Sequence, residues 1–267
     1  MFASCFLVLV IVLSVIACAV DVGGNGSAVS YESTASVGGS NGAVGSETGS
    51  DVVLSSSDGS ALIYVLPSPV VDGDVSVEAA LTGRRSHRSY QDMVLTLEQV
   101  SQILWSAYGV TLPSGSAAQR GGLRTAPSAG ALYPLEIYAI IGNVEGVDPG
   151  VYRYNSGEHT LEQVIAGDVR DAVREAALNQ GMVSQAPMSV FFSAVFSRTT
   201  ERYGERGVSY IYIEVGHSAQ NVYLQAEAMG LGTCAIGAFT DDTIRRVLGL
   251  ADDEEPLYLM PVGYVNS

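Results

Sequence analysis

The sequence predicts a folded domain of mixed α and β structure, in which strands and helices alternate along the chain. Short apolar runs rich in β-branched and aromatic residues alternate with segments whose apolar residues recur every three or four positions. Glycines and prolines separate these segments, as they do between regular elements. The length of 267 residues suffices for one domain with a sizeable core plus appendages. The alternation indicates the α+β or α/β class.

The chain begins with an apolar segment that ends in a cysteine. MFASCFLVLVIVLSVIACAV is short for a membrane span and fits the hydrophobic region of a signal peptide better. VIAC, which ends at Cys18, resembles a bacterial lipobox, although the usual preceding basic residues are missing. We expect residues 1–18 to be a signal or lipobox-like segment with Cys18 as the lipidation candidate; an uncleaved anchor and a mis-assigned start codon are the alternatives. The expected protein is exported and membrane-tethered, and a cytoplasmic protein is the other option.

Residues 19–74 predict a Gly/Ser-rich tether followed by an arm. Gly, Ser, Ala and Thr dominate residues 19–60, which therefore cannot bury enough apolar surface to offset the entropy of ordering. The apolar stretch 61–69 predicts a strand or arm that docks on the domain. The folded domain itself is expected over residues 75–267.

The first part of this domain predicts two helices and a strand. Ser76 is a suitable N-cap for a short helix that ends at Gly83. TLEQ, from Thr96, has the spacing of a capping box and opens an amphipathic helix that ends at Gly109. LEIYAII, residues 135–141, predicts a mostly buried strand.

The second part predicts a hairpin, then further helices and strands. GVYRYN and HTLEQVI predict the hairpin, DVRDAVREAAL a short amphipathic helix, and residues 188–196 an uncharged central strand. Residues 210–230 predict a long apolar helix that ends at Gly230. TCAIGAF predicts a strand or extended turn, DDTIRRVLG a short helix, and PLYLMPVGYV a final strand.

Composition excludes several classes of function. The net charge of −15 leaves no basic footprint for nucleic acid. All thirteen positive side chains are arginine, which excludes a Schiff-base lysine and a P-loop lysine. The three cysteines and three histidines lack metal-ligand spacing, so we expect no metal site.

An arginine-rich stretch, GRRSHRSY at residues 83–90, follows the first predicted helix. It holds three arginines and two serines in an otherwise acidic chain. Arginine offers a fixed fork for an oxyanion and serine adds a neutral donor, so the stretch suits a phosphate. A solvated loop whose arginines pair with surface carboxylates is the alternative.

Two further stretches are rich in small residues. In RTAPSAGALYPLEIY, from Arg124, small side chains would let the backbone approach a flat ligand, although a plain turn is at least as good an interpretation. In EVGHSAQNVYLQAEAMGLGTCAIGAF, His217, Gln220 and Asn221 lie on one helix face. A polar pair in a core or subunit interface is favoured there over a catalytic role.

Together, RRSHRSY, PSAGALYPLEIY and GHSAQNVYLQAEAMGLGTCAIGAF, followed by PVGY, resemble the FMN-dependent nitroreductase family, and most closely its SagB-type dehydrogenase branch. The resemblance covers roughly residues 75–264. It implies an α+β fold with a central, mostly antiparallel sheet flanked by helices. It also implies an obligate homodimer with FMN sites at the subunit interface.

The resemblance also implies which residues contact FMN. In the family pattern, the first stretch binds the phosphate, ribityl chain and ring edge. The second contacts the isoalloxazine from the partner subunit, and the third places backbone near the N5 edge. The corresponding residues here are Arg84, Arg85, Ser86 and Arg88, then Pro127, Ser128, Ala129, Gly130 and Leu132, and finally Ile236, Gly237 and Ala238. Because no basic residue follows Arg246, the family's basic C-terminal partner is missing, and the phosphate should depend more on the first stretch.

The implied activity is hydride transfer from NAD(P)H or an organic substrate, through flavin N5, to a small acceptor. Arg88 is the candidate for stabilising charge on the reduced ring. Some SagB-type relatives oxidise azoline rings to azoles in peptides with a Lys-Tyr pair. Here Tyr203 lies in the matching neighbourhood, but Arg202 replaces the lysine, and an always-charged arginine is a poor base. A peptide azoline dehydrogenase is therefore an alternative, and a non-catalytic flavin-binding surface protein is another.

Overall fold

The chain divides into two units, Met1–Glu47 and Thr48–Ser267. The computed structural model describes residues 53–54, 62–113 and 121–266, all in the second unit. The expected lipobox-like segment with Cys18, and nearly all of the Gly/Ser-rich tether, lie outside the described residues. Within the described part of the chain, no helix combines the length and apolar character needed to span a membrane.

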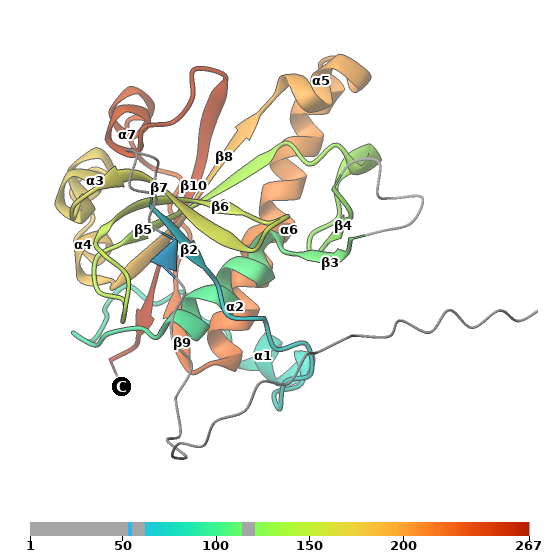
Figure 1. Ribbon diagram of the computed structural model, residues 1–267. Helices are drawn as coiled ribbons and strands as arrows, with labels where there is room; N and C mark the ends of the chain where they lie inside the picture. Colours follow the sequence, from blue (N-terminus) through green and yellow to red (C-terminus); the bar gives the residue numbers. More distant parts are fainter. Residues whose placement is uncertain (1–52, 55–61, 114–120, 267) are drawn as a thin grey trace, which may run out of the picture. The chain divides into compact units, whose positions relative to one another are not determined.

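An antiparallel sheet forms the centre of the second unit (Figure 1). In the described residues it has eight strands in the order β1-β2-β7-β6-β5-β8-β10-β9, and every ladder between them is antiparallel. The family-implied, mostly antiparallel sheet is thus confirmed. The strands are β1 Val53–Leu54, β2 Ile63–Val65, β5 Leu135–Ile141, β6 Gly150–Asn155, β7 Thr160–Ala166, β8 Met188–Val195, β9 Leu231–Thr233 and β10 Glu254–Tyr264, with a separate hairpin of β3 Val110–Leu112 and β4 Leu123–Arg124.

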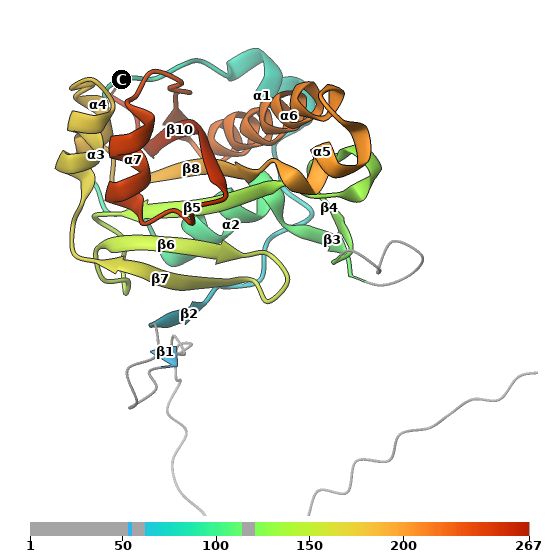
Figure 2. The same cartoon turned by 90° about the horizontal axis from the view of Figure 1, so that it is seen from above.

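Helices flank this sheet. They are α1 Val77–Gly83, α2 Leu97–Tyr108, α3 Arg170–Ala176, α4 Met182–Gln185, α5 Ser197–Tyr203, α6 Arg206–Ala228 and α7 Asp241–Leu248, with a 3₁₀ turn η2 at Ala129–Ala131. Both views show α3, α4 and α7 gathered together and apart from α2 and α6 (Figures 1 and 2).

Alternate side chains of the central strands enter two different cores. In β5, Leu135 and Ile137 belong to the core that includes α2 and α6, whereas Tyr138 and Ile140 belong to the core with α3 and α7. Because a strand covered on both faces can be apolar at every position, β5 and β8 read as continuous apolar runs in the sequence.

The predicted helix starts and the strand at 135–141 are confirmed. At the start of α2, the Thr96 hydroxyl accepts from the Gln99 N–H, and the Gln99 side chain accepts from the Thr96 N–H. At the start of α1, the Ser76 hydroxyl accepts from the Ala79 N–H at 3.1 Å.

The segment 198–208, for which the sequence predicts no helix before residue 210, forms α5 and the start of α6. Only Thr199 of α5 is buried, so the sequence lacks the apolar periodicity by which helices are recognised. Gly204, at φ +57°, separates the two helices in a backbone conformation that favours glycine.

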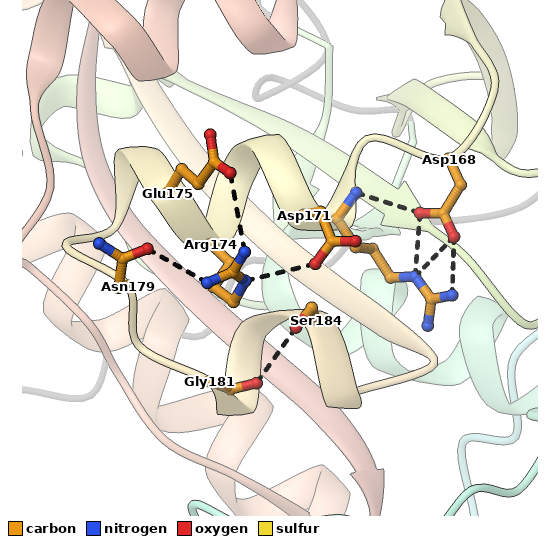
Figure 3. A network of polar contacts seen from close by, with 8 residues as sticks. Asp168, Asp171, Arg174, Glu175, Asn179, Gly181 and Ser184 are labelled. Atoms are coloured by element: carbon orange, nitrogen blue, oxygen red, sulfur yellow. Dashed lines mark hydrogen bonds and ion pairs between the residues drawn. The ribbon is translucent and has the colours of Figure 1, made fainter.

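A surface network links α3 to the residues on either side (Figure 3). Arg170 forms an ion pair with Asp168 at 2.7 Å. Arg174 pairs with Asp171 at 3.3 Å and donates to Asn179 at 3.1 Å. Exposed pairs of this kind contribute little to stability, so we assign them a local structural role.

Candidate functional site

The arginine-rich stretch runs in extended conformation along β9 after α1 ends. Ser86 forms a parallel bridge with Thr233, and the His87 N–H donates to the Thr233 carbonyl at 2.9 Å. The Ser86 hydroxyl also lies 3.1 Å from the hydroxyl of Tyr223 on α6. The stretch is therefore held between the edge of the sheet and α6.

The arginines of this stretch form no ion pairs with carboxylates of the described residues. Arg84 lies over the Tyr223 ring, 5.2 Å from its centroid. Arg85 donates to the carbonyls of Thr82, Gly83 and Arg84 and thereby provides a hydrogen-bond donor for the carbonyl groups at the end of α1. Arg84 is half-buried and Arg88 is exposed, and the positive charges of both are available to an anion, in contrast to the alternative of a loop neutralised by surface carboxylates.

The third stretch meets the first at Tyr223. The Ala235 N–H donates to the Tyr223 hydroxyl at 2.8 Å, and Ile236 exchanges two backbone hydrogen bonds with Leu259 of β10. Gly237 and Ala238, which follow, are exposed. One tyrosine hydroxyl thus contacts both predicted cofactor stretches.

The PSAG turn lies against α5. Gly130 of η2 has φ +64°, and a Cβ placed there would lie 2.7 Å from the Tyr203 hydroxyl and 3.0 Å from Arg202 Nη1. The Ser128 hydroxyl accepts from the Tyr133 N–H at 2.9 Å, which closes the turn. Pro127 and Gly130 are exposed, whereas Ser128, Ala129 and Leu132 are half-buried. Gly130 is therefore needed both for its backbone conformation and for the close approach of Tyr203 and Arg202.

A buried carboxylate supports this turn from behind. Glu214 of α6 is 2 % exposed and accepts a short hydrogen bond from Tyr108. Burial raises the pKa of Glu214, while hydrogen bonds from Tyr108, Ser128 and the Ala129 backbone oppose that rise. Sequence reasoning missed Glu214, although a single acidic residue within the apolar run YIYIEVG could have identified it.

Within one chain, the PSAG turn does not join the other two stretches. The turn contacts α6 at Glu214, whereas Ser86 and Ala235 contact it at Tyr223. Nine residues of α-helix span about 14 Å. Figure 1 shows the same separation, with α5 at one end of α6 and α1 and β9 at the other.

One face of α6 is exposed, beginning just before Glu214 and continuing toward Tyr223. Tyr212 and Ile213 are 55 % and 52 % exposed, and His217 and Gln220 continue the face one and two turns later. His217 forms no pair with Asn221 among the described residues; Asn221 instead donates to the Thr125 carbonyl at 3.2 Å.

Comparison with known proteins identifies the family. The Nitroreductase family model matches residues 81–264. The chain belongs to the nitroreductase family. A nitroreductase-family protein of Methanocaldococcus jannaschii is 45 % identical over 190 residues, which cover 71 % of this chain and 91 % of that protein.

Two more relatives extend the comparison. A nitroreductase-family structure from Ralstonia eutropha superimposes with a TM-score of 0.66 at 26 % identity, over 83 % of this chain and 97 % of the other. The microcin B17-processing protein McbC of Escherichia coli is 25 % identical over 179 residues, 65 % of this chain and 64 % of McbC. These relatives support an oxidoreductase as the enzyme class of this nitroreductase-family chain.

Proposed function

We propose that this chain is an FMN-dependent oxidoreductase that transfers hydride from NAD(P)H or an organic substrate to a small acceptor. The supporting observation is the meeting of the first and third stretches at Tyr223, beside arginines that have no carboxylate partner in the described residues. When bound, FMN supplies a reversible hydride acceptor at N5.

The residues at this meeting point fit such a cofactor. Arg84 and Arg88 supply guanidinium forks for a phosphate, and the exposed Ser86 hydroxyl adds a donor. Arg85 would have to leave the carbonyls at the end of α1 to join them. Among the described residues, only the Tyr258 ring lies close to Gly237, 3.6 Å from a Cβ placed there, so a flat ring can approach its backbone.

We further propose that the working unit is a homodimer built across α6. One protomer holds the phosphate-binding residues and the PSAG turn about 14 Å apart along the helix. A second copy packed on the exposed Tyr212 and Ile213 face could bring its own turn to the flavin. Tyr212 and Ile213 would lose their solvent exposure in such a dimer, which favours association.

The absorption spectrum of the purified full chain tests the proposal. We expect a yellow protein, and anaerobic addition of NADH or NADPH should bleach it. A colourless protein that fails to bind added FMN would contradict the cofactor assignment. A yellow protein that neither nucleotide bleaches would favour the non-catalytic flavin-binding alternative or another electron donor.

Arg88 is proposed to stabilise negative charge on the reduced ring. Arg88 is exposed. Burial raises the pKa of the Cys234 thiol, which directly follows β9, and the positive charge of Arg88 opposes that rise. Removal of this charge in Arg88→Ala should lower the flavin reduction potential. A potential equal to that of the parent protein, measured by dye-coupled spectrophotometric titration, would refute this role.

A peptide azoline dehydrogenase is the second candidate, and the position of Tyr203 favours it. The Tyr203 hydroxyl and the Arg202 guanidinium both lie against the PSAG turn, at Gly130. Arg202 cannot serve as a proton acceptor, so Tyr203 would have to act without the lysine of azoline-oxidising relatives. Oxidation of a thiazoline-containing peptide that is lost in Tyr203→Phe, with flavin binding retained, would support this candidate.

The membrane tether remains our proposal for the N-terminus. Its support is the lipobox-like sequence ending at Cys18. Mass analysis of the native N-terminus should find a lipid-modified Cys18, and an intact Met1 would contradict the proposal.

A further inference from the structure

A polar cavity lies between the β3–β4 hairpin, the start of β5, the β6–β7 turn and the start of α5. Its volume is about 390 Å³, within the range of small-molecule sites. The charged residues of its lining are Arg124, Arg153, Arg198, Glu136 and Glu162. Nothing in the proposed flavin chemistry uses this cavity.

The two glutamates of the lining are already engaged. Glu136 pairs with Arg153 and with Arg198, each at 2.6 Å and each through a different carboxylate oxygen. Glu162 accepts from Asn155 at 2.9 Å. Neither glutamate forms an ion pair with the third arginine, Arg124, in the described residues.

Arg124 lacks an acidic partner in the described residues. Its guanidinium lies between the rings of Tyr108 and Tyr133, 4.4 and 4.7 Å from their centroids. Its Nε is buried without a hydrogen-bond partner in the described residues. The positive charge of Arg124 favours the ionised form of Glu214, but the hydrogen bonds to Glu214 come from Tyr108, Ser128 and the Ala129 backbone. A partly buried cation with an unsatisfied donor costs free energy, which a bound anion would recover.

We propose that this cavity binds a small organic monocarboxylate, and that Arg124 binds the carboxylate. Among the described residues of the lining, three guanidinium groups against two carboxylates leave one positive charge, which suits a monoanion better than a phosphate dianion. A planar carboxylate matches the guanidinium fork. Tyr108, Tyr154, Leu135 and Ile137 also line the cavity but are almost completely buried, so most of the accessible lining is polar.

Calorimetric titration of the purified full chain with benzoate tests this site, with the uncharged benzamide as the ligand control. We expect saturable benzoate binding, about tenfold or more tighter than that of benzamide. Arg124→Gln should weaken benzoate binding by about tenfold or more. Arg246→Gln is the matched control, since exposed Arg246 also carries one positive charge but lies on α7, away from the cavity; it should bind as the parent does.

A second variant keeps the test informative if Arg124→Gln fails to fold. Ser156, in the β6–β7 turn, lines the cavity, and Ser156→Trp should block it without removing any charge. Loss of benzoate binding in Ser156→Trp, with the flavin spectrum unchanged, supports the site even if Arg124→Gln unfolds. Equal binding of benzoate and benzamide, or parent-like binding in either variant, would overturn the proposal. So would benzoate binding that perturbs the flavin spectrum, because the ligand would then occupy the cofactor site.

Discussion

Replacement of Tyr223 by phenylalanine tests whether one hydroxyl organises the candidate cofactor site. The hydroxyl lies 3.1 Å from the Ser86 hydroxyl and accepts from the Ala235 N–H at 2.8 Å. Tyr223→Phe removes both contacts and keeps the ring on which Arg84 lies. The change therefore isolates the hydrogen bonds from the aromatic stacking.

The expected loss of stability depends on whether Ser86 and Ala235, the two partners of the Tyr223 hydroxyl, can bond to water instead. Ser86 is exposed and can bond to water instead, so its lost contact costs little. The Ala235 N–H is only partly accessible and loses its acceptor, which costs about 1–2 kcal/mol in the free energy of unfolding. Because Ser86 is proposed to contact FMN and Ala235 directly precedes the proposed contacts Ile236–Ala238, we also expect FMN affinity to fall by about tenfold.

Denaturant unfolding and fluorimetric FMN titration measure the two effects separately. Tyr210→Phe is the matched control, since the Tyr210 hydroxyl makes no hydrogen bond within the described residues. Parent-like stability and FMN affinity in Tyr223→Phe would refute the bridging role. A loss of stability with unchanged affinity would show that the bridge is structural only.

Three further changes have expected outcomes. Gly130→Ala should destabilise the fold by about 1–2 kcal/mol in denaturant unfolding, because φ is +64° and Tyr203 lies 2.7 Å from the new Cβ; parent-like stability would contradict this. Burial raises the pKa of Glu214, so its contribution to stability is present below the ordinary glutamate pKa and is lost as pH rises through the folded pKa. Glu214→Gln should therefore gain thermal stability relative to the parent as the pH rises above the ordinary glutamate pKa, and a difference that stays constant with pH would count against the raised pKa. Ile213→Glu, on the exposed face of α6, should convert a dimer to monomers in light scattering; a dimer that persists would argue against this interface.

The sequence predicted best those elements whose signals are local. The capping box at Thr96 and the apolar run at 135–141 each lie within a few residues, and both predictions are confirmed. The first helix after β8 was missed because only Thr199 of its seven residues is buried, so no periodic apolar face marks it.

The candidate site was predictable in its segments but not in its contacts. The three stretches were recognised from their own residues. The role of Tyr223 was not predicted, because its contact with Ser86 joins residues 137 positions apart and no local sequence pattern indicates such a contact. The role of Glu214 was not predicted for a related reason, since its hydrogen-bond donor Tyr108 lies 106 positions away in the sequence.

Helix α6, Arg206–Ala228, is continuous between Glu214 and Tyr223, so it fixes both the distance between these two residues and their relative orientation around the helix axis. Each residue inserted between Glu214 and Tyr223 would lengthen it by about 1.5 Å and rotate one contact against the other by about 100°. A single insertion would thus turn either the support of the PSAG turn or the tyrosine bridge away from its partner. Substitutions along the exposed face are compatible with both contacts, whereas insertions and deletions are not. The spacing of these two residues is therefore a stricter requirement than the identity of most residues between them.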